Sequence, residues 1–214
     1  MKLENMSDEV TPDLQPTATK RRSRNKLWLF LGVALILIIG IAITPDILRK
    51  IEKNRDVKCK DNLKQLYCAL KQYAMDFDDH FPDSDNIEGL GKLHGDYMKG
   101  YSLCCCPSAN TGIIHDKLSD KNISYVYFGG FMEMSSIWWP NIQYSPMLFD
   151  RPGNHKDHIN YIYDYGNVET LNTKAKTCSE FIEDMNRKIK YHPILLKKLR
   201  EKAAEADRRY SQEK

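Results

Sequence analysis

Two histidines and two aspartates near position 155 are the residues of this sequence best suited to chemistry. His155, Asp157, His158 and Asp164 are spaced closely enough to form a metal or catalytic cluster, because imidazole and carboxylate groups bind metal ions and transfer protons. No serine nucleophile elbow, His-Glu-x-x-His motif or glycine-rich phosphate loop accompanies them. We therefore expect no catalytic residue, no enzymatic activity and no cofactor other than the calcium considered next.

A run of aspartates upstream suggests calcium, a hard cation that prefers clustered oxygen ligands. The run comprises Asp76, Asp78, Asp79, Asp83 and Asp85. Counted from Asp76 as an EF-hand loop, the sixth position, which must be glycine, is Phe81. The EF-hand motif is therefore excluded. The run is interpreted as a polar loop that ends a helix, with a looser calcium site as the alternative.

The cysteines favour structural disulfides. The six are Cys59, Cys68, Cys104, Cys105, Cys106 and Cys178. The adjacent three lack the Cys-x-x-Cys spacing of a zinc site or of a redox-active pair. An even number fits a disulfide framework in an oxidising compartment. Cys59 and Cys68 are nine residues apart in a predicted helix, roughly 13 Å along its axis, and so cannot bond to each other.

The apolar residues are unevenly distributed along the chain. The 214 residues carry a formal charge of +3 and a mean hydropathy of −0.57, yet residues 27–44 contain no charged side chain. These eighteen residues would span roughly 27 Å as a helix, enough for the hydrocarbon core of a bilayer. We predict one uncleaved transmembrane anchor at 27–44, in contact with membrane lipid, after a disordered tail at 1–26. Acidic and basic residues are interspersed, so nucleic acid is not an expected partner.

The charges that flank the anchor favour a cytoplasmic N-terminus. Five basic residues are packed into positions 20–26, whereas six are spread over positions 49–60 and mixed with acids. The denser group favours the cytoplasmic side of the membrane. Every cysteine follows the anchor, which favours export of the C-terminal part into an oxidising compartment.

Beyond the anchor, the sequence predicts one helix, then strands, and then helices near the C-terminus. Apolar residues recur at intervals of three and four between positions 59 and 77, which predicts a helix over 45–78 with one apolar face. The segments 123–128, 159–163 and 168–171 have the composition and the flanking turn residues of strands. Thr177 and Glu180 fit a capping box that begins a helix, and Pro193 ends that helix or begins another.

Several short motifs resemble one protein family in their order and spacing. They are Cys59-Lys-Asp-Asn-Leu-Lys-Gln with Ala69-Leu70, Tyr73, Asp76 and Phe81-Pro82, then Cys106-Pro107-Ser108, Ser124–Tyr127, Pro146–Asp150 and Gly153–Glu169. Over about residues 27–171 the chain resembles type IV pilin-like and type II secretion pseudopilin-like proteins, above all those with a late His-x9-Asp-Gly signature. The chain departs from that signature at Tyr165-Gly166, where the family has Asp-Gly.

The resemblance implies an α+β, pilin-like fold. A long N-terminal helix, membrane-spanning in its first half, would pack on a small antiparallel sheet, with a C-terminal helical extension. The expected divisions are the tail at 1–26, the anchor at 27–44, a periplasmic pseudopilin-like domain at 45–172 and the extension at 173–214.

The resemblance also implies roles for individual residues. In the family the Cys-Pro-Ser loop returns to the helix, which favours a disulfide from Cys59 to Cys106 or to Cys104, with Cys68 and Cys178 as further disulfide candidates. Some pseudopilins bind calcium in their C-terminal loops, which makes Asp150, Asp157 and Asp164 candidate calcium ligands. The histidines fall in the family's closing hairpin, where loop-fixing hydrogen bonds are expected.

The expected function is a structural or interaction role in type II secretion or pilus machinery. The protein would be a single-pass protein of the bacterial inner membrane, with a cytoplasmic N-terminus and a periplasmic domain, and its partners would be pilin-like or secretion-platform proteins. Lys26 precedes the apolar run and no glutamate interrupts it, so we expect neither cleavage by prepilin peptidase nor a role as filament subunit. The alternative is a membrane-tethered ligand- or metal-binding module that reuses the fold.

Overall fold

The computed structural model describes residues 19–109, 117–130, 145–163 and 166–211. The chain divides into two compact units, residues 1–49 and 50–214. Helix α1, Thr19–Asp76, contributes residues to both units and includes Pro45. Residues 19–26 of the predicted disordered tail are helical, and the remainder of that tail lies outside the described residues.

The first unit exposes the apolar side chains of α1. The described large apolar side chains between Trp28 and Ile41 are between 51% and 74% exposed. In the part of the chain that the structure describes, no helix is both long enough and apolar enough to cross a membrane. The side chains at positions 27, 36, 39, 40, 42 and 43 of the predicted anchor lie outside the described residues.

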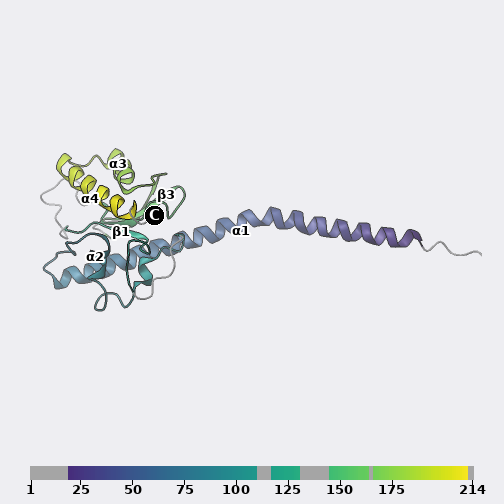
Figure 1. The fold of residues 1–214 in the computed structure, drawn as a ribbon, viewed down its shortest axis with the longest axis horizontal. Helices are drawn as coiled ribbons and strands as arrows, with labels where there is room; N and C mark the ends of the chain where they lie inside the picture. The colour runs from purple at the N-terminus through teal and green to yellow at the C-terminus, as the bar shows by residue number, and fades with distance from the viewer. Residues whose placement is uncertain (1–18, 110–116, 131–144, 164–165, 212–214) are drawn as a thin grey trace, which may run out of the picture. The chain divides into compact units, whose positions relative to one another are not determined.

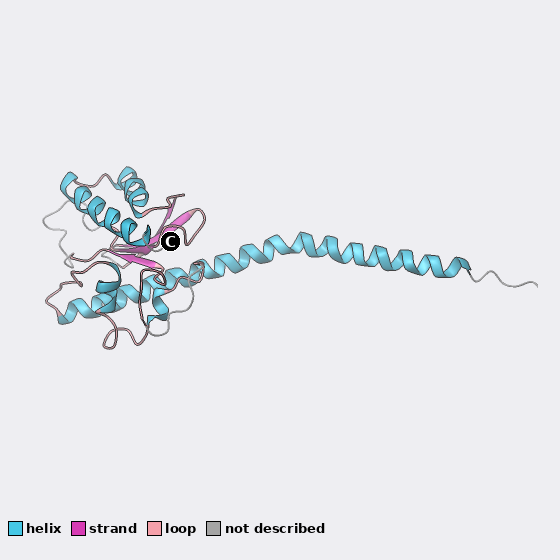
Figure 2. Ribbon diagram, in the orientation of Figure 1, coloured by secondary structure: helices cyan, strands magenta, loops and turns pink. Residues whose placement is uncertain are grey.

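The second unit is a mixed α+β structure built around a four-stranded antiparallel sheet. The strands are β1 (Tyr125–Tyr127), β2 (Leu148–Asp150), β3 (His158–Ile162) and β4 (Val168–Asn172), and they pair in chain order. Helix α2 (Asn86–Gly91) and a 3-10 helix (Tyr101–Cys104) lie between α1 and the sheet in the sequence. Helices α3 (Cys178–Ile189) and α4 (Pro193–Ser211) follow β4. Within this unit the sheet lies between α1 and α2 on one side and α3 and α4 on the other (Figures 1 and 2).

Alternation along the strands gives the sheet two different faces. Tyr125 points to α1 and donates its hydroxyl to the Cys59 carbonyl at 3.3 Å, and Asn160 reaches the same helix. Phe149 and Tyr161 point the opposite way, and their rings lie 4.7 and 6.0 Å from that of Phe181 on α3. Because successive residues of a strand face opposite sides, one strand supplies both faces of the core.

The apolar stripe of α1 packs against the first of these faces. Its residues Cys59, Leu63, Leu66 and Leu70 are fully buried. The predicted stripe extends to Phe77, but α1 ends at Asp76 and the Phe77 side chain is 49% exposed. Asp78 and Asp79 then adopt positive φ values of 51° and 59°, a left-handed conformation that does not continue the helix.

Helices α3 and α4, expected as an extension, share the core of the sheet. Thr177 caps α3 as predicted, since its hydroxyl accepts the Glu180 backbone N–H at 3.1 Å. Glu180 reaches back to the N–H of Lys176 at 2.7 Å, one residue earlier than in the usual capping box. The buried face of α4 consists of Leu195, Leu199, Ala203, Ala206 and Tyr210. Helices α3 and α4 therefore form a second helical layer within the second unit.

Candidate functional site

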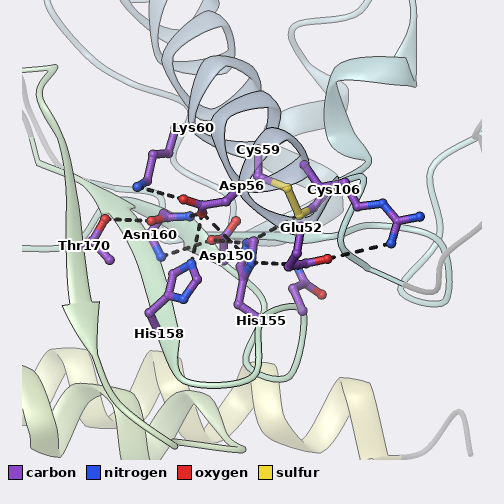
Figure 3. Close-up of polar contacts among 12 residues, drawn as sticks. Glu52, Asp56, Cys59, Lys60, Cys106, Asp150, His155, His158, Asn160 and Thr170 are labelled. Carbon is purple, nitrogen blue, oxygen red and sulfur yellow. Dashed lines mark hydrogen bonds and ion pairs between the residues drawn. A yellow bond between two sulfur atoms is a disulfide. The ribbon is translucent and has the colours of Figure 1, made fainter. Parts of the chain in front are cut away.

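The candidate site lies where α1 crosses the polar end of the sheet. We call Glu52, Asp56, His155 and His158 the Asp56 cluster. Glu52 and Asp56 are one turn apart on α1, His155 belongs to the loop between β2 and β3, and His158 begins β3. Figure 3 shows these side chains converging beside the disulfide.

The helical repeat explains why α1 supplies these groups. Asp56 lies three residues before Cys59, so the two share the face that packs on the sheet. The side chain of Asp56 is 18% exposed, and that of Glu52 is 53% exposed. Towards its N-terminus, the buried face of α1 thus ends in the partly buried carboxylate of Asp56, followed one turn earlier in the chain by the exposed carboxylate of Glu52.

The carboxylate of Asp56 contacts three polar side chains, two on β3 and one on α1 itself. It takes the Asn160 side-chain amide at 2.8 Å and pairs with Lys60 at 2.9 Å, and Thr170 fixes Asn160 from the next strand at 2.8 Å. Nε2 of His158 lies 2.9 Å from the same carboxylate. Burial acts to raise the pKa of Asp56, but the hydrogen bonds of Asn160, His158 and Lys60 outweigh it and lower that pKa to about 2.

His158 is held between two carboxylates. Its Nδ1 lies 2.9 Å from Asp157, and its Nε2 lies 2.9 Å from Asp56. Burial acts to lower the pKa of His158, but the hydrogen bonds to Asp157 and Asp56 outweigh burial and raise it above its ordinary value. The loop-fixing role expected for this histidine is therefore one of its functions in the structure.

His155 is the most deeply buried member of the cluster. Its side chain is 1% exposed, and its Nε2 lies 3.1 Å from the Asp150 carboxylate and 3.6 Å from the Cys106 sulfur. Its Nδ1 has no hydrogen-bond partner among the described residues and lies 4.0 Å from the carboxylates of Glu52 and Asp56. The ring stacks on that of His158, with 4.4 Å between ring centroids. One nitrogen of a buried histidine is thus aimed at the cluster without a hydrogen bond.

A disulfide closes the site on its apolar side. The structure joins Cys59 of α1 to Cys106, one of the two pairings that the sequence left open. Asn62 adds a second link between helix and loop, because its side-chain amide donates to the Cys105 carbonyl at 2.8 Å. The Cys-Pro-Ser loop is therefore attached to α1 by a covalent bond and by a hydrogen bond.

Three other predicted disulfide candidates are not bonded. Cys104 is a buried thiol, and its burial raises its pKa to about 12. Cys68 is an exposed thiol, because it lies on the face of α1 opposite the packed stripe. Cys178 begins α3 on the other side of the sheet from Cys59, and its buried thiol interacts with Asp207. The predictions of disulfides from Cys104, Cys68 and Cys178 are therefore wrong for this structure.

The carboxylates proposed for calcium are used differently. Asp150 is fully buried and also accepts the Asn160 backbone N–H at 3.0 Å, while Asp157 faces His158. Neither belongs to a group of three close ligands within the described residues, and Asp164 lies outside those residues. In the upstream aspartate run, Asp83 pairs with Lys92 and Asp85 pairs with Lys202, at 2.5 and 2.6 Å. The run contains no group of three close ligands either, within the residues searched.

Sequence reasoning singled out both histidines but missed Glu52 and Asp56. Both acids are far from the histidines in the sequence: Asp56 and His158, for example, are 102 residues apart. The available signal was the position of Asp56 on the same helical face as Cys59. Asn160, which donates a hydrogen bond to Asp56, was also missed. It lies in the predicted strand 159–163, and the sequence did not indicate which residues of that strand would face α1.

Comparisons with protein-family models, with curated proteins and with solved structures find no match to this chain. The resemblance to pilin-like proteins therefore rests on the sequence motifs alone. In the structure, a disulfide joins α1 to the Cys-Pro-Ser loop, and two histidines lie beside the carboxylates of α1.

We expect the disulfide to contribute strongly to stability. It joins positions 47 residues apart, and closing a loop of that length in the unfolded chain is worth about 4 kcal/mol. The double substitution Cys59→Ala with Cys106→Ala should lower the free energy of unfolding by about 2–4 kcal/mol, measured by denaturant titration of the full chain. Cys68→Ala, which removes an exposed thiol, is the control and should change it by less than about 0.5 kcal/mol. Equal stability of the double variant and the control would contradict this expectation.

Proposed function

We propose that this chain is a membrane-anchored, pseudopilin-like protein with a structural or interaction role in type II secretion or pilus-type machinery. It is a single-pass protein of the bacterial inner membrane, with a cytoplasmic N-terminus and a periplasmic domain formed by the second unit. The observation that carries the proposal is the uncharged run 27–44, whose described large apolar side chains are more than half exposed along α1.

The exposed apolar run is costly in water. Trp28, Phe30 and Ile41 are at least 70% exposed, and the described large side chains between them are also more than half exposed. Soluble monomers rarely expose a contiguous apolar surface of more than a few hundred Å². A lipid environment would cover every side of such a helix, and the basic residues at 20–26 fit the phosphate surface of the cytoplasmic leaflet.

The second unit supports a periplasmic placement. The Cys59–Cys106 disulfide fits an oxidising compartment, since the cytosol keeps most thiols reduced. The buried stripe of α1 against a small antiparallel sheet also agrees with the arrangement that the pilin-like resemblance implies. The third layer formed by α3 and α4 is an addition to that arrangement.

The anchor also argues against a filament subunit. In pilin-like proteins a glutamate in the apolar run pairs with a neighbouring subunit, and residues 27–44 contain no acidic side chain. The proposed role is therefore that of an anchored relative that contacts the machinery without polymerising in it.

Membrane attachment should depend on the apolar run. Each lysine at the centre of a membrane helix costs about 2.5–3.5 kcal/mol. The double substitution Leu35→Lys with Ile38→Lys should therefore move the full chain from the carbonate-resistant membrane pellet to the supernatant. The matched control Ile51→Lys with Val57→Lys adds the same charge at exposed positions outside the run and should leave the chain in the pellet. Release of the control, or retention of the anchor variant, would contradict the anchor.

The native thiol of Cys68 reports the orientation. It is exposed on the second unit, so a membrane-impermeant maleimide should label it in intact spheroplasts if that unit is periplasmic. Cys68→Ser should remove this label and thereby identify the site. Labelling that appears only after the spheroplasts are lysed would place the unit in the cytoplasm and contradict the orientation.

The interaction role predicts a defined set of partners. Affinity purification of the full chain from mild-detergent extracts, after cross-linking in intact cells, should recover pilin-like proteins or secretion-platform components as judged by mass spectrometry. The Leu35→Lys with Ile38→Lys variant should lose them. Recovery of neither class from the wild-type chain would refute the proposed role while leaving the membrane anchor intact.

A further inference from the structure

We propose that Asp56, His155 and His158 form a binding site for a zinc-like transition-metal dication, with Glu52 at its open side. The site lies entirely in the second unit, so it does not depend on the membrane placement proposed above. The sequence offered both histidines as members of a metal or catalytic cluster with Asp157 and Asp164, whereas the structure brings them to Asp56 of α1. The predicted calcium ligands Asp150 and Asp157 take a supporting role in the site.

The ligand atoms are close to the distances that zinc requires. One oxygen or nitrogen atom from each of the three residues lies within 4.8 Å of the others. Nε2 of His158 is 2.9 Å from the Asp56 carboxylate, and Nδ1 of His155 is 4.0 Å from it. Tetrahedral zinc with bonds of about 2.0–2.1 Å separates its ligand atoms by about 3.3 Å. Side-chain adjustments of up to about 1 Å per atom would therefore complete the coordination.

The hydrogen bonds of His158 direct one nitrogen to the site. In a neutral ring whose Nδ1–H donates to Asp157 at 2.9 Å, the lone pair of Nε2 would face the Asp56 carboxylate. Two acceptors facing each other repel unless a second proton or a metal ion lies between them. A carboxylate on the outer nitrogen is the arrangement that orients histidine ligands in zinc sites.

His155 repeats this arrangement from the buried side. Asp150 lies 3.1 Å from Nε2 of His155, so the proton of a neutral ring is placed there. Nδ1 then presents its lone pair to Glu52 and Asp56, and it has no hydrogen bond from the described residues. Because the side chain is 1% exposed, leaving this nitrogen without a partner is unfavourable, and a bound cation would remove that cost.

The charge balance favours one dication over two protonated rings. The imidazoles of His155 and His158 stack with centroids 4.4 Å apart, so two imidazolium charges would repel each other strongly. Four carboxylates surround the pair, from Glu52, Asp56, Asp150 and Asp157 (Figure 3 labels the first three). A single divalent cation bound by both rings would offset two of these four negative charges, as two protonated rings would, without placing a charge on both imidazoles.

The donor set selects the class of metal. Two imidazole nitrogens with carboxylate oxygens suit zinc and its neighbours, whereas calcium requires six to eight oxygens. Cys59, Cys106 and His155 also form a close group, but both sulfurs are in the disulfide and present no thiolate. The proposed site is therefore compatible with the oxidised domain, and Glu52, which is 53% exposed, or water would occupy the fourth position.

The test is a zinc titration of the full chain, purified without reductant, in competition with a chromophoric chelator. The wild-type chain should bind one Zn²⁺, and Co²⁺ in its place should give the intense visible absorption of a tetrahedral site. Asp56→Asn and His158→Gln should each raise the Kd by at least about 100-fold, and Asp157→Asn, which affects only the orientation of His158, by about 10–100-fold. His80→Gln is the matched control, because His80 is an exposed histidine beside two aspartates outside the cluster.

Circular dichroism of each metal-free variant separates lost binding from lost folding. Stoichiometric binding that Asp56→Asn and His158→Gln abolish in folded protein, and that His80→Gln preserves, would establish the site. Absence of stoichiometric binding by the wild-type chain would overturn the proposal. Binding that survives both substitutions would also overturn it. Binding that requires reduction of the disulfide would assign the metal to Cys59 and Cys106 and equally refute this site.

Discussion

The packing of one face of α1 on one face of the sheet is the constraint on which the rest of the second unit depends. That single contact buries Cys59 and the leucines that follow it, and it places Asp56 one turn earlier at the edge of the same interface. The disulfide can form because Cys59 is turned to the loop. The polar contacts can form because Asn160 and Thr170 pair across β3 and β4, and Asn160 points to Asp56. A rotation of α1 by one residue would turn both Cys59 and Asp56 away from their partners.

The sequence predicted those elements of the structure that have a periodic pattern of apolar residues or a recognisable capping residue. The spacing of Cys59, Leu63, Leu66 and Leu70 predicted the packed face of α1, and Thr177 predicted the start of α3. It did not predict strand β2 or helix α2, because three and six residues are too few to show a period. Strand β1 is as short as β2, but it lies in a longer run of strand-forming residues at 123–128. Only part of the site could be predicted from the sequence. Both histidines were identified as candidates, but no local pattern indicates that Asp56 contacts His158, which is 102 residues away in the chain.

The C-terminal helices show why charge alone is a poor guide to exposure. The segment 193–211 is rich in lysine, arginine and glutamate, yet its small and apolar residues form a continuous buried face. Its charges are also used: Arg209 pairs with Glu88 of α2, and Asp207 accepts the first N–H groups of α3. Arg151 lies 3.8 Å over the ring of Tyr210. The last helix therefore secures the loop that carries His155 from the side opposite α1.

The continuity of α1 from the first unit into the disulfide has a mechanical consequence. A pull along the N-terminal part of α1 would reach the polar contacts of Asp56 first and the sulfur–sulfur bond one turn later, before it reached Leu63 and the rest of the apolar stripe. Non-covalent packing separates residue by residue under such a force, whereas a covalent bond must break at once. The disulfide from Cys59 to Cys106 would therefore keep the rest of α1 from separating from the sheet. Tension applied to α1 would be transmitted to the loop that contains Cys106 rather than to the apolar core.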